Sequence, residues 1–506
     1  MSETTELVER SLSAETAEQF MTRVNQQADR LREAIRAGTL DNPDFAVGLE
    51  MEVYCVDADG RLADVPDDTY AAGATKELGV HNAEINTDPD TFDDAGLGAQ
   101  ADRISAQFGA ADDAAATEDY RLVSDAMWTV PPETGSEAYL GTTEDREGVV
   151  FATNMRADPR YTALDNETLR LCDGAIEFDV PGVDRTFPSI LFESLATSIQ
   201  PHLQIPRAEE FPAYYNAAIR TLGPVLALST NSPFLPPDLY TDVSDPEGLV
   251  DETHHELRIA AFEQSMNATP SPKVRVPADI DSAEETVDRV VEDDLFAPFL
   301  REWMADEPRE SFADENWEFD YKRSTYWRWL RCVVGGDPVG DGDERSLRIE
   351  YRPIPTQPTT NDVVSMQWLT VGLIRGLVET DHPLADLPWE LARESFYNAV
   401  RDGLAGELHW LTAAGEQTTD QALIFDEVFE IARAGLDAAG VSDQRIESRL
   451  RPLEQRFETR TTPSVWKRER VRDRLQAGDD LSTAITTMQR EYIQRSRDTD
   501  SFAEWI

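Results

Sequence analysis

The spacing of hydrophobic residues divides the chain into three regions. From about residue 13 to 38, apolar residues recur every three to four positions, which predicts a surface helix. Residues 45–56 form a long, mostly apolar run and predict a strand, which the Asp57–Gly60 turn ends. After about residue 388 the pattern predicts helices only, about four of them. The expected organisation is an N-terminal helix (1–40), an α+β region (41–384) and a helical C-terminal region (385–506).

The central region mixes the two periodicities. Strands are predicted at 83–86, 198–205, 326–334 and 346–353, and helices at 99–127, 209–230, 281–305 and 361–379. Strands and helices do not alternate regularly, so the pattern favours an α+β fold over a parallel βα fold.

Four of the predicted strands carry two polar residues separated by one position. Side chains alternate along a strand, so both members of a pair lie on one face. The simpler interpretation is that each pair faces solvent, as in any half-exposed strand. Four pairs in one chain, with four carboxylates and one histidine, favour a functional face instead. The pairs are Glu50 and Glu52, Glu84 and Asn86, His202 and Gln204, and Glu350 and Arg352.

Clustered carboxylates repel one another unless a cation neutralises them. Oxygen-rich ligand sets select Mg²⁺ or Mn²⁺, and Mg²⁺ usually binds together with substrate phosphates. His254-His255-Glu256 is not a zinc-binding HExxH sequence, because Ile259 stands in the second histidine position, and it is expected on a helix surface.

Composition restricts the partners and the location. The chain has 46 basic and 98 acidic residues, a net charge of −52, and this excludes nucleic acid and anionic membranes as partners. Acid-rich, lysine-poor composition is typical of a halophilic protein, because salt screens the self-repulsion. The three cysteines are far apart and suggest a reducing interior. With no signal peptide and no long apolar span, a cytoplasmic location is expected.

Six short motifs, read in order over residues 45–380, resemble the glutamate–cysteine ligase family, which includes other carboxylate–amine ligases. They are GLEMEVYCVDADGRL, AEINTDP, SLATSIQPHLQIP, LALSTNSPF, STYWRWLR and SLRIEYRPIPTQPT. The resemblance implies a fold like the catalytic domain of glutamine synthetase, a curved antiparallel sheet whose concave face binds ATP and divalent metals. Residues 41–384 would then be the ATP-dependent ligase catalytic domain, and the source would be a halophilic archaeon.

The resemblance also implies roles for single residues. Metal ligands would be Glu50, Glu52, Glu84, His202 and Glu350; catalytic residues Arg352 and Arg331; ATP-binding residues Arg352 and Gln204; and substrate-binding residues Asn86 and Arg258. Two positions depart from the family pattern. Gln204 stands where a second histidine is usual, and Pro355 stands where an aspartate is common.

The implied reaction is an ATP- and Mg²⁺-dependent (or Mn²⁺-dependent) ligation of glutamate to cysteine, through an acyl phosphate, in thiol biosynthesis. Three alternatives stay open: another amine acceptor, a non-catalytic family member that binds a nucleotide or metabolite, and a metal-dependent hydrolase. A complete set of four glutamates argues against the non-catalytic alternative. No feature of the sequence indicates the oligomeric state.

Overall fold

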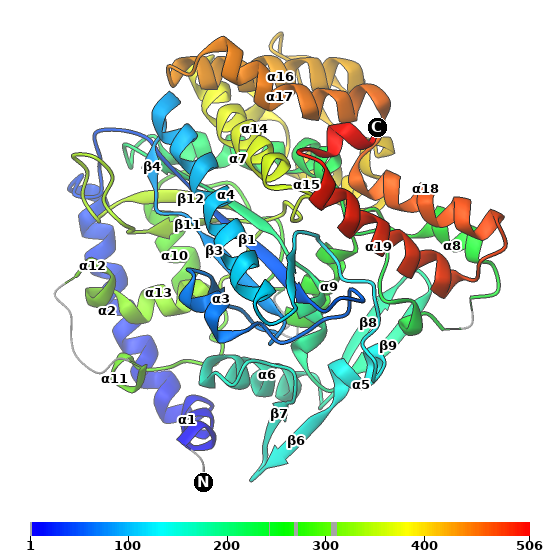
Figure 1. Ribbon diagram of the computed structural model, residues 1–506. Coiled ribbons are helices and arrows are strands. Elements are labelled where there is room, and N and C mark those ends of the chain that lie inside the picture. Colours follow the sequence, from blue (N-terminus) through cyan, green and yellow to red (C-terminus); the bar gives the residue numbers. More distant parts are fainter. Residues whose placement is uncertain (1–2, 242, 268–271, 305–310) are drawn as a thin grey trace.

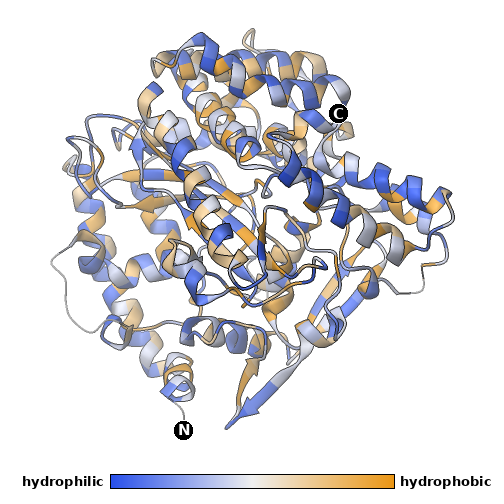
Figure 2. Cartoon of the chain, viewed as in Figure 1, coloured by the Kyte–Doolittle hydropathy of each residue, from blue (hydrophilic) through white to orange (hydrophobic). Residues whose placement is uncertain are grey.

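The computed structural model describes residues 3–241, 243–267, 272–304 and 311–506. A central antiparallel sheet runs through the molecule, with α2 on one side and the C-terminal helices α16 to α19 along the top and right in Figure 1. The outer helices carry hydrophilic residues on their exposed sides, and hydrophobic residues gather toward the interior (Figure 2). In the described part of the chain, no helix combines the length and apolar character needed to cross a membrane.

The central sheet has eight strands in the order β11-β12-β10-β1-β3-β2, with β4 and β5 pairing the two ends of β1. Its strands are β1 Ala46–Val56, β2 Thr75–Lys76, β3 Asn82–Asn86, β4 Asp90–Thr91, β5 Arg121–Val123, β10 Ile199–Ile205, β11 Leu330–Val334 and β12 Leu347–Tyr351. Three separate hairpins are β6 Thr143–Arg146 with β7 Val149–Ala152, β8 Ile176–Val180 with β9 Val183–Phe187, and β13 Trp410–Leu411 with β14 Gln417–Thr418.

Helices surround this sheet. The first ten are α1 Glu3–Ser11, α2 Ala14–Arg36, α3 Asp67–Ala71, α4 Asp94–Ala116, α5 Ser136–Gly141, α6 Pro159–Leu171, α7 Phe211–Ser229, α8 Pro246–Glu252, α9 Leu257–Met266 and α10 Glu284–Glu292. The later ones are α11 Arg301–Met304, α12 Phe312–Glu315, α13 Trp317–Ser324, α14 Thr360–Glu379, α15 Trp389–Asp402, α16 Gln421–Ala438, α17 Asp443–Thr459, α18 Pro463–Gln476 and α19 Leu481–Asp498. Short 3₁₀ turns are η1 Ile190–Leu195, η2 Pro237–Leu239, η3 Pro383–Asp386, η4 Gly403–Ala405 and η5 Phe502–Trp505.

The two faces of the sheet differ in chemistry, as the alternation in the sequence predicts. On β1, Leu49, Met51 and Val53 are buried, and α14 contacts both β1 and β10 on that side. The neighbouring helix α7 is anchored to the sheet by Tyr215, whose hydroxyl donates to the Leu330 carbonyl at 3.0 Å. The opposite face carries the polar pairs, and there Arg323 of α13 lies 3.8 Å from Glu350.

Two fully buried ion pairs connect the C-terminal helices to the rest of the fold. Arg456 on α17 pairs with Asp362 on α14 at 3.0 Å, and both side chains have no exposed surface. Lys467 on α18 pairs with Asp125 at 2.5 Å, and Gln489 on α19 donates to the same carboxylate at 2.6 Å. A charge that lost its partner in such a setting would be strongly destabilising.

Most predicted elements are present, but three of them have wrong boundaries. The helix predicted to reach 127 ends at Ala116; a turn with Asp119 at φ 66° follows, and residues 121–123 form β5 instead. The strand predicted from 326 begins only at Leu330. The helix predicted over 281–305 is two helices, because the chain turns at Ala297, with φ 38°, before Pro298. Its last predicted residue, 305, lies outside the described residues.

The C-terminal region is also not purely helical. Five α-helices, α15 to α19, replace the four expected, and the β13–β14 hairpin interrupts them. The hairpin is only two residues per strand, too short for an alternating pattern to reveal it.

Candidate active site

One side of the site lies on β1 and β3. Their antiparallel register places Glu52 opposite Glu84 and Glu50 opposite Asn86. Asn86 donates to the Glu84 carboxylate at 2.7 Å. Four of the predicted site residues therefore lie on one face of two adjacent strands.

The other side lies on β10, β11 and β12. His202 on β10 is opposite Glu350 on β12, and Glu350 is opposite Arg331 on β11. Because β10 also pairs with β1, with His202 opposite Gly48, the two halves form one continuous polar face. The glycine has no side chain, so the imidazole can reach across toward Glu50.

Glu50, His202 and Glu350 form the centre of the face. Their candidate ligand atoms all lie within 4.8 Å of one another. His202 Nε2 is 3.1 Å from Glu50 Oε1, and neither ring nitrogen makes a hydrogen bond to the described residues. The His202 side chain is only 9% exposed, and a buried polar atom without a partner is costly. A divalent cation would satisfy the imidazole and both carboxylates, so these residues fit a metal.

Two arginines flank Glu350. Arg331 donates to one carboxylate oxygen at 2.5 Å, and Arg352 donates to the other. Burial alone would raise the pKa of Glu350, but the Arg331, Arg352 and His202 charges hold it well below 4.5. Arg352 also donates to Gln200 at 2.6 Å, while its Nε has no partner among the described residues. Glu350 is therefore ionised at any physiological pH, and Arg352 has spare donor capacity.

A second group of carboxylates lies beside this centre. Burial, and then repulsion from Glu77, raises the pKa of Glu52 to about 7. Burial, and then repulsion from the Glu52 and Glu77 carboxylates, raises the pKa of Glu193 to about 8. Burial and the neighbouring carboxylates raise the pKa of Glu84 well above 4.5. Glu52, Glu77 and Glu193 line a cavity of about 20 Å³, large enough for one water molecule or ion.

Arg258 lies at the far end of the face. It donates to the Pro353 carbonyl, and its guanidinium lies 5.4 Å from the Trp329 ring centroid. Glu256 Oε1 is 3.6 Å from Arg258 Nε, which makes no hydrogen bond to the described residues. The expectation that Glu256 lies on a helix surface is wrong: it is fully buried in the loop before α9 and accepts a hydrogen bond from Ser232 at 2.5 Å.

Gln204 lies at the opposite end, toward the start of β1. Its amide donates to the Asp44 carbonyl at 3.1 Å, and it is opposite Arg348 in the sheet. Glu50, His202, Gln204 and Arg348 help to line a cavity of about 160 Å³. The structure thus brings every predicted site residue onto this face or to one of its ends.

Several polar residues of the face were not predicted. Gln200 donates to Glu52 at 3.3 Å, and Arg348 extends the row formed by Glu350 and Arg352. Gln200 lies two positions before His202, and Arg348 lies two positions before Glu350. The alternation of side chains along each strand would therefore have predicted both. Glu77 and Glu193 lie outside such a pattern, and only the folded chain reveals them.

A chain of hydrogen bonds leads from the face to the C-terminal helices. The Glu52 carbonyl accepts from the Thr356 hydroxyl at 3.0 Å, and the Thr356 carbonyl accepts from the Asn231 amide at 2.8 Å. The Asn231 carbonyl accepts from Lys467 at 2.8 Å. The backbone under Glu52 is therefore supported from α18.

Comparisons with known proteins identify the class. The structure resembles that of glutamate–cysteine ligase from Francisella tularensis in complex with AMP, with a TM-score of 0.52, 12% identity and coverage of 90% of each chain. A bifunctional glutathione synthetase from Pasteurella multocida gives a TM-score of 0.49 at 14% identity, covering 92% of this chain and 53% of that one. No curated protein sequence matches the chain. The fold is that of the glutamine synthetase-like ligases, as expected, and the class is ATP-dependent carbon–nitrogen ligase.

The sequence profile of glutamate-cysteine ligase family 2 matches residues 46–498, so the chain belongs to that family. The match extends from the start of β1 to the end of α19 and therefore includes the C-terminal helices.

Proposed function

We propose that this protein joins the γ-carboxylate of glutamate to the amine of cysteine, with ATP and Mg²⁺ or Mn²⁺ as cofactors. The family supports an ATP-dependent ligation of a carboxylate to an amine. The observation that carries the proposal is the cluster of Glu50, His202 and Glu350, in which the buried imidazole lies 3.1 Å from Glu50 and makes no hydrogen bond to the described residues. We also propose a cytoplasmic location and a role in thiol biosynthesis.

The chemical problem is that a carboxylate is a poor acylating agent. Transfer of the ATP γ-phosphoryl group to the glutamate carboxylate would release ADP and give an acyl phosphate. The amine would then attack the acyl carbon and displace inorganic phosphate. Bound metal would supply the positive charge that neutralises the phosphates. The face offers no nucleophilic side chain at its centre, which suits a reaction governed by positioning and charge.

The protein side chains divide this work by position. Glu50, His202 and Glu350 would hold one cation, while Glu52 and Glu84 would hold another beside it. Arg352, whose Nε has no partner among the described residues, would bind the ATP phosphates through its planar fork. Arg331 fixes Glu350 in position by its 2.5 Å hydrogen bond, which is the support we propose for its catalytic role.

Substrate binding is assigned to the ends of the face. Arg258 is held by its ion pair with Glu256 and by Trp329, so it would bind the glutamate carboxylate that does not react. The side-chain amide oxygen of Asn86 has no hydrogen-bond partner among the described residues and would accept a hydrogen bond from the substrate ammonium group. Gln204 would contact ATP at the other end of the face, in the 160 Å³ cavity that it lines together with Arg348.

The experiment is an ADP-release assay with mass analysis of the product. The protein, in molar KCl with Mg²⁺, receives ATP, glutamate and one amine from a panel that includes cysteine. We expect ADP only when glutamate and cysteine are both present, together with γ-glutamylcysteine. Release from ATP alone would indicate a hydrolase, and release with a different amine would replace cysteine as the acceptor. Glu50→Gln should be inactive, whereas Glu209→Gln, an exposed glutamate outside the face, should be active.

A further inference from the structure

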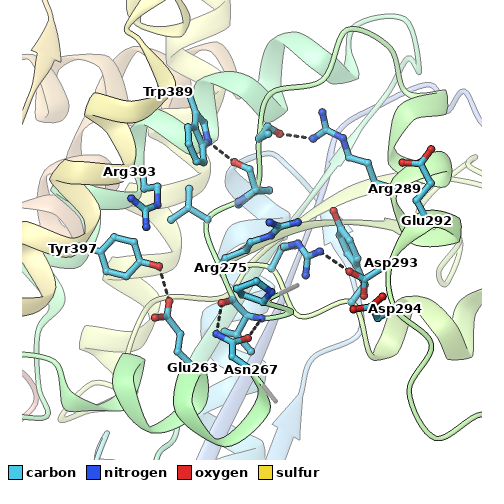
Figure 3. A pocket seen from close by; sticks show the side chains of 17 residues that line it. Glu263, Asn267, Arg275, Arg289, Glu292, Asp293, Asp294, Trp389, Arg393 and Tyr397 are labelled. Atoms are coloured by element: carbon cyan, nitrogen blue, oxygen red, sulfur yellow. Dashed lines mark hydrogen bonds and ion pairs between the residues drawn. The ribbon is translucent and has the colours of Figure 1, made fainter. Parts of the chain in front are cut away.

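A second, larger cavity lies away from the polar face. It has a volume of about 660 Å³, within the range typical of small-molecule sites. Its walls come from α9, α10, α15, residues 272–278 and the segment that leads into β11 (Figure 3). None of its lining residues belongs to the candidate active site, so the proposed ligation leaves it without a role.

Two arginines without a hydrogen bond or ion pair to the described residues line this cavity. The guanidinium groups of Arg275 and Arg393 make no hydrogen bond and no ion pair to the described residues; Arg393 only stacks on the Tyr397 ring at 5.0 Å. Arg289 differs from them, because its guanidinium donates hydrogen bonds to the Ala278 carbonyl at 2.5 Å and to the Glu285 carboxylate at 3.2 Å. In Figure 3, Arg275 lies at the centre, between Arg393 and Arg289. Acidic residues outnumber basic ones about two to one in this chain, so two such guanidinium groups at one cavity indicate a site for an anion.

The side of the cavity opposite Arg393 carries negative charge. Glu292 and Asp294 are exposed, and their carboxylates make no hydrogen bond or ion pair to the described residues. Figure 3 shows them across the cavity from Arg393. A ligand that spans the cavity would meet cationic groups at one end and anionic groups at the other.

Aromatic rings complete the walls, and their polar atoms are already used. Trp389 donates its indole N–H to the Pro277 carbonyl at 2.6 Å, and the Tyr397 hydroxyl donates to Glu263 at 2.8 Å. These hydrogen bonds fix the orientation of both rings. Their remaining surface is apolar and suits the body of a ligand rather than its charged ends.

We propose that this cavity binds a small zwitterion, an amino acid or a short peptide. Its carboxylate would bind between Arg275 and Arg393, its ammonium group would face Glu292 and Asp294, and its side chain would pack on the aromatic wall. The two guanidinium forks match a carboxylate in geometry as well as charge.

The test uses isothermal titration calorimetry on the full-length protein, at the lowest KCl concentration that keeps it folded. The probes are glycyl-phenylalanine, its N-acetyl form without the ammonium group, its amide without the carboxylate, and inorganic phosphate. We expect glycyl-phenylalanine to bind with the highest affinity of the four. Arg275→Ala with Arg393→Ala should weaken its binding by roughly tenfold or more, because charged hydrogen bonds are lost.

A matched control removes two exposed arginines elsewhere, Arg207→Ala with Arg451→Ala, which changes the net charge equally and should leave the affinity unchanged. Glu292→Gln with Asp294→Asn should weaken the dipeptide but not its N-acetyl form. Absence of saturable binding by all probes, or binding that survives loss of Arg275 and Arg393, overturns the proposal. Phosphate binding as tight as the dipeptide and equally dependent on both arginines would also overturn it, in favour of a simple anion site.

Discussion

Replacing Glu52 by glutamine is expected to stabilise the metal-free protein while it abolishes function. The Glu52 carboxyl has a pKa of about 7 in the fold, against an ordinary value of 4.5, because burial and the charge of Glu77 disfavour its ionised form. As pH rises from about 4.5 to about 7, the unfolded chain releases this proton and the folded chain does not, so the folded state loses stability. The cost is fully present above about pH 7 and absent below the unfolded pKa.

The magnitude follows from the two pKa values. Each factor of ten in proton affinity corresponds to about 1.4 kcal/mol, so the Glu52 carboxylate costs on the order of 3 kcal/mol near pH 8. Glutamine removes the charge and keeps an oxygen that can accept from the Ser198 N–H, which now donates to the carboxylate at 2.6 Å. It also relieves the repulsion on Glu193.

The assay is urea unfolding of the wild type and of Glu52→Gln in molar KCl with a chelator, at about pH 5 and about pH 8. The variant should be more stable by up to roughly 3 kcal/mol at the higher pH and by less than about 1 kcal/mol at the lower pH. Added Mg²⁺ should stabilise the wild type more than the variant, which keeps only the Glu50, His202 and Glu350 site. A variant that is less stable at pH 8, or equally altered at both pH values, would refute the crowding of carboxylates around Glu52.

Three further outcomes are expected. Arg352→Lys should lower ligation by roughly 10²-fold or more, because a lysine cannot reproduce the planar fork toward the phosphates, and added metal should not restore it; near-normal activity would remove Arg352 from the site. The melting temperature should rise steeply with KCl up to molar concentrations, because salt screens the −52 net charge, and a flat response would give the acidity another cause. Lys467→Met should destabilise the protein by about 3–5 kcal/mol in urea unfolding by leaving Asp125 buried and unpaired. Adding Asp125→Asn to Lys467→Met should recover part of that loss. A Lys467→Met variant as stable as the wild type would contradict the pairing.

The polar face was predictable because it depends on a local rule. Alternation on each strand places Glu50 with Glu52 and His202 with Gln204, whatever the rest of the chain does. The order of the strands was not predictable in that way. His202 meets Glu50 only because β10 lies between β1 and β12, a pairing of segments about 150 residues apart that no local pattern encodes. The family resemblance supplied that missing information.

Other features were missed for physical reasons that differ from case to case. The Ala-rich stretch before Asp119 has high helix propensity, and a positive φ at one residue is enough to end the helix. Glu77 and Glu193 are single acidic residues, and an acidic residue in so acidic a chain predicts only a solvated surface. Glu256 belongs to the same class by sequence, but hydrogen bonds from Asn231 and Ser232 hold it in the interior. The division into residues 41–384 and 385–506 stays a prediction.

The hydrogen bonds from Glu52 to Lys467 have a consequence for how the protein is made. The strands of the face leave the ribosome early, but the lysine that holds the Asn231 carbonyl and neutralises Asp125 follows that aspartate by 342 residues. Until it arrives, Asp125 is a charge without its partner in a half-built interior. We expect nascent chains to stay loosely packed around β1 and to acquire their final order only after synthesis has passed α18. A cell that makes this protein therefore completes the support beneath Glu52 late, when the C-terminal helices are available.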